Sequence, residues 1–163
     1  MRGVADDLVI RRAVGDDLEA VARLAGALVR MHHATDPARF LLVDKVEEGY
    51  AGWFSRELKR GKAVILVACV GPEIVGYGYG TIEERDWNLL LDVHGALHDV
   101  FVAEEARRAG VGKALIEELV RALEALGAPR VVLSTMVGNE TAQQLFQDCG
   151  FRPTMLEMTR NRP

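Results

Sequence analysis

The sequence predicts an α/β (α+β) protein in which strands and amphipathic helices follow one another within a single domain, residues 1–163. Two neighbouring apolar segments, 63–70 and 73–83, are joined by a Gly-Pro turn and predict an antiparallel strand pair. A third apolar segment, 97–102, runs through a short charged turn into a long amphipathic helix. A chain of 163 residues can bury one sizeable core but is short for two.

The first third of the chain predicts one strand and two helices. Residues 8–12 have the composition of a short strand. Apolar residues then recur at helical spacing over 18–29, and Pro37 ends that helix. A second amphipathic pattern covers 46–58. The adjacent His32 and His33 diverge by about 100° on a helix, so we expect no metal site there.

The strand pair in the middle of the chain carries an unusual glycine pattern. Residues 63–70 are almost continuously apolar, which predicts that both faces of this strand are covered. In the returning strand, 73–83, three glycines share one face: Gly76, Gly78 and Gly80. A bare strand face indicates close approach by a ligand or another backbone, and tight packing of a helix explains it equally well.

The segment after residues 97–102 combines a strand, a charged turn and two glycines. Gly110 and Gly112 allow the backbone to turn sharply and to come close to a ligand. The helix that follows, 111–126, leaves its first N–H groups unpaired at the positive end of its dipole. This combination favours a phosphate or pyrophosphate, although a tight strand-to-helix turn alone would use the same glycines.

The last third predicts a strand, a helix and a terminal strand. Residues 130–137 are again apolar and follow a Gly-Ala-Pro helix stop. Asn139 can cap a helix that Gly150 ends, and residues 151–159 complete the pattern as a strand.

Composition excludes several classes of protein. The net charge of −4 argues against a general nucleic-acid binder. No apolar run approaches the length of a membrane span, and the first residues lack the apolar core of a signal peptide. The two cysteines, Cys69 and Cys149, lie in apolar patterns without metal-ligand spacing. We therefore expect a protein of the reduced cytoplasm that binds neither nucleic acid nor membrane.

Two motifs carry a family resemblance. Arg107, Gly110 and Gly112 form an Arg-x-x-Gly-x-Gly sequence, which resembles the acyl-CoA pyrophosphate-binding motif of the GNAT superfamily of N-acetyltransferases. A second family signature, Asn-x-x-Ala-x-x-Leu-Tyr-x-x-x-Gly-Phe, is matched at Asn139, Ala142, Leu145, Gly150 and Phe151. Its tyrosine is replaced here by Phe146.

The resemblance covers nearly the whole chain and implies the GNAT acyl-CoA N-acyltransferase fold. That fold has a mixed, mostly antiparallel sheet flanked by about four helices, with a splayed central strand pair. It also implies direct transfer of an acetyl group from acetyl-CoA to an amine, with no metal and with both substrates bound together. The residues expected to bind the cofactor are Val100, Phe101, Val102, Arg107, Arg108, Ala109, Gly110, Val111, Gly112, Lys113, Asn139 and Phe146. A homodimer is a further expectation.

Three residues are candidates for the general base that takes a proton from the amine. The segment 97–102 resembles the polyamine/diamine acetyltransferase branch, where a glutamate acts as base at the position of His98. The unperturbed pKa of histidine, about 6.5, suits this task. Strand alternation predicts that His98 shares a face with Val100 and Val102, with Asp99 on the other face. Asp99 and a water relay from Glu83 are the alternatives.

The family assigns protonation of the departing thiolate to the tyrosine that Phe146 replaces. Solvent, Ser134 or Cys149 could take over that role. The missing hydroxyl also keeps two other readings open. One is an acyl-CoA-binding sensor or catalytically weak partner subunit, and the other is a nucleotide-binding module that uses only the glycine turn.

Overall fold

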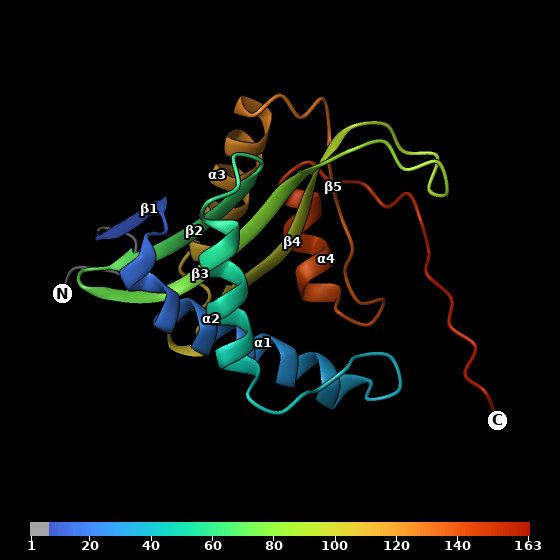
Figure 1. Cartoon of the computed structure of the whole chain (residues 1–163), viewed down its shortest axis with the longest axis horizontal. Helices are drawn as coiled ribbons and strands as arrows, with labels where there is room; N and C mark the ends of the chain where they lie inside the picture. Colours follow the sequence, from blue (N-terminus) through green and yellow to red (C-terminus); the bar gives the residue numbers. More distant parts are fainter. Residues whose placement is uncertain (1–6) are drawn as a thin grey trace.

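The fold is a five-stranded mixed sheet with two helices on each face, seen in a computed structural model that describes residues 7–163 (Figure 1). The strand order is β1-β2-β3-β4-β5; neighbouring strands run antiparallel except β4 and β5, which are parallel. The elements in chain order are β1 (Leu8–Arg12), α1 (Leu18–Thr35), α2 (Val46–Glu57), β2 (Ala63–Val70), β3 (Glu73–Glu83), β4 (His94–Val102), α3 (Val111–Ala125), β5 (Val131–Leu133) and α4 (Glu140–Asp148). The predicted fold class is confirmed.

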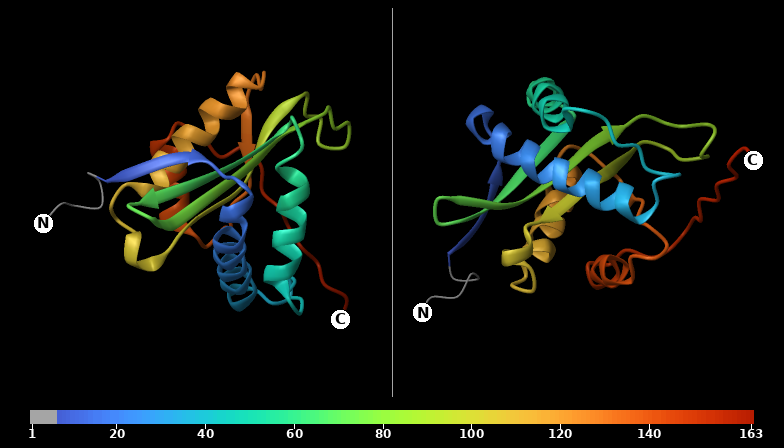
Figure 2. Two further views of the ribbon diagram at one scale, coloured as in Figure 1. Left: turned by 60° about the vertical axis from the view of Figure 1, so that its left-hand side comes forward. Right: turned by 90° about the horizontal axis from the view of Figure 1, so that it is seen from below.

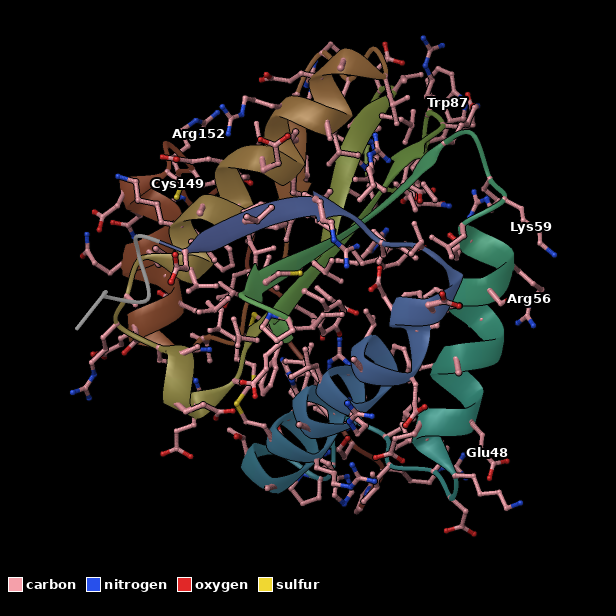
Figure 3. The ribbon with its side chains drawn as sticks, turned by 90° about the vertical axis from the view of Figure 1, so that its left-hand side faces the viewer. Glu48, Arg56, Lys59, Trp87, Cys149 and Arg152 are labelled. Carbon is pink, nitrogen blue, oxygen red and sulfur yellow. The ribbon has the colours of Figure 1, made fainter. Side chains whose placement is uncertain are left out.

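The sheet separates two apolar cores. Figure 2 shows α1 and α2 on one face of the sheet and α3 and α4 on the other. Side chains of β2 alternate between the cores: Leu66 packs toward α3, whereas Ile65 and Val67 pack toward α1 and Phe54 of α2. The continuous apolar pattern of this strand is thereby explained, because both of its faces are buried. On the outer side of α2, Glu48 and Arg56 point away from the sheet (Figure 3).

The glycines of β3 serve helix packing. A Cβ atom at Gly80 would lie 2.9 Å from the carbonyl oxygen of Ala96 and 3.0 Å from Leu123 of α3. A Cβ at Gly76 would meet the Phe101 carbonyl oxygen at 2.9 Å. The bare face of β3 thus accommodates both the backbone of β4 and the side chains of α3.

We expect Gly80→Ala to lower the free energy of unfolding by about 1–3 kcal/mol, because the new Cβ would press on the Ala96 carbonyl of β4 and on Leu123 of α3. Gly78→Ala is the matched control on the same strand face, since its nearest contact would be an ordinary 3.4 Å to Leu119. Denaturant unfolding of both variants measures the difference. Equal stabilities for the two variants would show that α3 can move away from the sheet at little cost.

Strands β4 and β5 separate after a short paired stretch, as the resemblance implies. Strand β4 pairs with β5 only through Gly95, Ala96 and Leu97. The remainder of β4, up to Val102, continues without β5 beside it. This splayed region lies next to the turn that leads into α3.

Two expectations for the C-terminal third are wrong. The strand expected over residues 130–137 is limited to Val131–Leu133. The strand expected over 151–159 does not form; Phe151 packs against the core, and the residues after it run exposed away from the sheet (Figure 1). Pro153 has no N–H to offer a neighbouring strand, and Met155 and Met158 remain exposed. An apolar pattern predicts a strand only where a partner strand is within reach.

No helix among residues 7–163 has both the length and the apolar character needed to cross a membrane.

Candidate active site

The turn between β4 and α3 presents uncapped backbone amides to solvent. It contains a short 3-10 turn, Glu104–Ala106, and two residues in the left-handed region, Arg108 (φ 63°) and Gly110 (φ 79°). Gly110 directly precedes α3, and its place at the N-cap supplies no side chain to the first N–H groups. The first turn of α3 also has no acidic residue. An anion would therefore be stabilised by both the free amides and the helix dipole.

The two motif glycines have different surroundings. A Cβ at Gly110 would have no atom within 4 Å, so the space beside Gly110 at the start of α3 is open. A Cβ at Gly112 would lie 3.2 Å from Leu145 of α4 and 3.8 Å from Val102. Gly112 thus allows α4 to approach α3, a packing role that the motif alone does not reveal.

The three cationic side chains of the turn, Arg107, Arg108 and Lys113, differ in their contacts with the rest of the protein. The Nε of Arg107 donates to the carbonyl oxygen of Val102 (3.0 Å), and its guanidinium lies 5.5 Å from the centre of the Phe101 ring. Arg107 therefore ties the turn to the end of β4. Lys113 lies 3.8 Å from Glu117 on α3, and Arg108 is exposed. These three cations share the turn with the exposed carboxylates of Glu104 and Glu105.

The splayed part of β4 has a defined set of free backbone groups. The N–H of Ala103 donates to the carbonyl oxygen of Val75 (2.8 Å). This bond shows which residues of β4 direct their backbone groups toward β3. In an antiparallel ladder every second residue bonds to the same neighbour, so Phe101 bonds toward β3. Val100 and Val102 direct their backbone groups to the opposite side, where β5 has ended. The gap-facing amide belongs to a neighbour of Phe101, not to Phe101 itself.

The residues of the second signature run from the N-cap of α4 to just beyond its C-terminal end. The side-chain oxygen of Asn139 accepts from the N–H of Ala142 (3.1 Å), which confirms its role as N-cap. Phe146 is half-buried in the core below α3, with its ring 6.0 Å from that of Phe151. Burial raises the pKa of the nearby Cys149 thiol, which makes it a weaker proton donor than an ordinary cysteine.

A β-bulge changes the faces on which the candidate bases lie. Tyr79 pairs with Asp99, but the next residue of β3, Gly80, pairs with Leu97, so His98 is an extra residue in β4. His98 stacks on Tyr79 and Asp99 accepts from the Tyr77 hydroxyl (2.9 Å), which places both on the side of α1 and α2. The expectation that His98 shares a face with Val100 and Val102 is wrong, because alternation assumes an unbroken ladder.

The ring of His98 has two polar neighbours on β3. Its Nε2 lies 2.7 Å from the hydroxyl oxygen of Thr81 and 3.8 Å from a carboxylate oxygen of Glu83. The Thr81 hydroxyl in turn donates to Glu83. The side chains of His98 and Glu83 are 40% and 45% exposed, so a dissolved molecule can reach both. The structure thus brings together two of the three predicted bases, linked by a threonine that sequence analysis missed.

The buried carboxylate of Glu57 holds Tyr79, the residue on which His98 stacks. Glu57 of α2 accepts from the hydroxyl of Tyr79 and from Arg60 (2.9 Å). Burial opposes ionisation of Glu57, but these two hydrogen bonds outweigh it and lower its pKa. Burial, and next the bond to Glu57, raises the pKa of Tyr79, so its hydroxyl stays a donor.

Asp99 lies deeper than His98. Burial raises the pKa of Asp99, against the effect of the hydrogen bond from Tyr77. Burial, together with the charge of Asp99, also raises the pKa of Tyr50 to about 12. The sequence does hint at this group, since the tyrosines and threonine at 77, 79 and 81 alternate with glycines and so share the face opposite α3.

A cavity of about 520 Å³ opens beside Glu83 at the far end of β3. Its lining combines both signs of charge with one aromatic side chain: Arg60, Lys62, Ile82, Glu83, Glu84, Arg85, Asp86, Trp87 and Asn88. Figure 3 shows Trp87 at the outer end of the β3–β4 hairpin. Glu83 connects this cavity with Thr81 and His98.

Comparison with known proteins agrees with the fold and the motifs. The sequence pattern of the acetyltransferase (GNAT) family matches residues 28–151. An N-alpha-acetyltransferase of Sulfurisphaera tokodaii is 32% identical over 132 residues, which are 76% of this chain and 79% of that protein. The chain therefore belongs to the GNAT family of acetyltransferases.

Solved structures show the same architecture. A probable acetyltransferase has a TM-score of 0.71 at 25% identity, with 95% of this chain and 97% of that chain covered. An aminoglycoside N-acetyltransferase in complex with CoA has a TM-score of 0.74 at 18% identity, with 95% and 94% covered. Members of this family use acetyl-CoA as the acetyl donor.

Proposed function

We propose that this chain transfers the acetyl group of acetyl-CoA directly to a primary amine of a small molecule or protein, with both substrates bound at once. The observation that carries the proposal is the continuity between the open edge of β4 and the uncapped start of α3. One extended ligand with a pyrophosphate at one end fits both features. The Arg-x-x-Gly-x-Gly motif and the family membership support the same reading.

In this proposal each part of the cofactor has its own protein groups. The amides of Val111, Gly112 and Lys113 hold the pyrophosphate, with Arg108 and Lys113 adding positive charge. The backbone N–H and C=O of Val100 and the N–H of Val102 pair with the pantetheine arm as a strand would, while the Val102 carbonyl oxygen already accepts from Arg107. The carboxamide N–H of Asn139 is left for the arm, because its oxygen already caps α4.

Two protein groups would assist the chemical step. A gap-facing amide of β4, such as that of Val100, polarises the thioester carbonyl, and such a donor contributes roughly 3 kcal/mol in other acyl-transfer sites. The acceptor amine is cationic in water and must lose a proton before it can attack. His98 is the proposed base, since it is the more exposed of the two adjacent candidates, His98 and Asp99. A water relay to Glu83 is the remaining alternative.

Two acceptor classes are supported. The Sulfurisphaera tokodaii relative is named as an N-alpha-acetyltransferase, which favours the α-amino group of a polypeptide. The resemblance of residues 97–102 to the polyamine/diamine branch and the carboxylates around the cavity beside Glu83 favour a small cationic amine. Measuring CoA release in a thiol assay with peptides and with di- and polyamines separates the two classes.

Thermal unfolding with added ligands tests the cofactor assignment. Acetyl-CoA and CoA should raise the melting temperature, whereas ATP at the same concentration should raise it far less, because a ligand stabilises only the state to which it binds. Equal stabilisation by ATP would favour a general nucleotide-binding module.

A catalytically weak acyl-CoA sensor is the second candidate, and Phe146 is the observation that favours it. If Phe146 occupies the position of the general acid, Phe146→Tyr should preserve or raise turnover, since the new hydroxyl would reach the departing thiolate. Turnover and acetyl-CoA affinity of the folded variant measure this. A variant whose only change is weaker acetyl-CoA binding would show that residue 146 does not face the thiolate.

A further inference from the structure

We propose that Thr81 and Glu83 are positioning residues that hold the ring of His98 with its hydrogen on Nε2, leaving Nδ1 to take the proton of the acceptor amine. The inference rests on the proposed function, because it deepens the role of His98 in acetyl transfer. Its physical basis is a three-residue hydrogen-bond chain between β3 and β4.

Counting hydrogens fixes the direction of this chain. A carboxylate has no hydrogen to give, so the single hydroxyl hydrogen of Thr81 goes to Glu83. The Thr81 oxygen can then only accept from Nε2 of His98, which lies 2.7 Å away. In neutral imidazole one nitrogen donates and the other accepts, so a hydrogen on Nε2 leaves a free lone pair on Nδ1.

The surroundings hold this arrangement in place. Thr81 is 1% exposed, so its hydroxyl cannot exchange its partners for water. The ring of His98 stacks on Tyr79 with the ring centres 5.1 Å apart, and the hydroxyl of Tyr79 is itself fixed by Glu57. Among residues 7–163 the hydrogen bonds of the His98 ring involve Nε2 only, while the side chain stays 40% exposed. Nδ1 is therefore the ring nitrogen left without a hydrogen-bond partner among these residues.

Several carboxylates lie on the same side of the sheet as the ring. Glu83 of β3 lies 3.8 Å from Nε2, Asp99 is the next residue of β4, and Glu57 of α2 faces the same side of the sheet. The nearby cations are themselves paired, Arg60 with Glu57, Lys62 with Glu84 and Arg85 with Asp92. When the amine N–H bond breaks and an Nδ1–H bond forms, the imidazolium therefore gains stabilisation through Thr81 and Glu83. Release of that proton to water returns the ring to its starting state.

NMR of ¹⁵N-labelled histidine, without any substrate, tests the arrangement directly. In the unmodified chain the nitrogen shifts of neutral His98 should identify an Nε2–H ring. In Thr81→Val the ring loses its acceptor, so the titration of His98 should move to lower pH by about half a unit or more. Thr81→Ser keeps the hydroxyl and should restore the titration. Glu83→Gln removes the nearby charge and should also move it to lower pH, whereas Glu84→Gln, whose carboxylate pairs with Lys62, should not.

The same variants are then compared in acetyl transfer. The acid limb of the kcat profile should move with the NMR titration in Thr81→Val and return in Thr81→Ser. A neutral ring with its hydrogen on Nδ1, or an unchanged titration in Thr81→Val, would overturn the proposal. A moved titration with an unmoved kcat limb would overturn it as well, while acetyl transfer, measured by CoA release in the unmodified chain, would stand. Absence of CoA release with every amine would instead refute the proposed function.

Discussion

Gly110→Val should weaken acetyl-CoA binding by roughly 30-fold or more, which corresponds to about 2 kcal/mol. The new side chain would project into the open space at the start of α3, where Gly110 now has no neighbouring atom within 4 Å. A phosphate could then no longer approach the amides of the first turn. Calorimetric titration of the folded variant with acetyl-CoA measures the loss.

The chain offers a matched control for this substitution. Gly127, at the other end of α3, also has a positive φ (98°) and open space around its Cβ position. Gly127→Val imposes similar backbone strain without touching the proposed site, so its acetyl-CoA affinity should stay close to that of the unmodified chain. If Gly110→Val also binds normally, the pyrophosphate lies elsewhere.

His98→Ala should lower the rate at saturating substrate about 100-fold, typical for loss of a general base, and leave acetyl-CoA affinity almost intact. A base must be neutral to accept a proton, so the rate of the unmodified enzyme should rise with pH through the pKa of His98 in the ternary complex. The variant should lose this limb of the profile. Measurement of kcat between pH 5 and pH 9, with rates normalised to folded protein, checks both expectations.

His94→Gln provides a comparison on the same strand. The ring of His94 is buried beyond the bulge and bonds to the backbone of Asp92, so this variant should keep the pH-dependent limb. A near-normal rate and an unaltered profile in His98→Ala would transfer the base role to Asp99, Glu83 or water.

Much of the fold could be predicted from local pattern. The sequence predicts the position of six elements to within a few residues at one end or both: helices α1, α2 and α3 and strands β1, β2 and β3. The apolar stripe of each helix and the alternation in each strand show which of its faces is buried, and this pattern can be read within one element. The prediction of a strand over residues 151–159 is wrong because a strand there would need a partner strand, which the local pattern does not specify.

The site was predictable only where a motif specifies it. The arginine and glycines of the turn before α3 follow from sequence spacing, whereas their part in binding a cofactor stays a prediction. The faces of His98 and Asp99 depend on one extra residue in the ladder with β3, which strand alternation cannot reveal. The contacts of Thr81 and Glu57 with the site join segments distant in sequence, so no local pattern indicates them. A homodimer and a single domain over residues 1–163 stay predictions.

The splayed end of β4 also has a consequence for self-association. An unpaired strand edge can be extended by any other extended chain, and proteins commonly block such edges with proline or lysine. Residues 98–102 contain neither, since a blocked edge could not pair with a ligand. The charge that the segment does carry, on Asp99, is turned toward Tyr77 and away from the edge. In the proposed function the pantetheine arm covers this edge, so we expect the ligand-free protein to be the form most prone to associate.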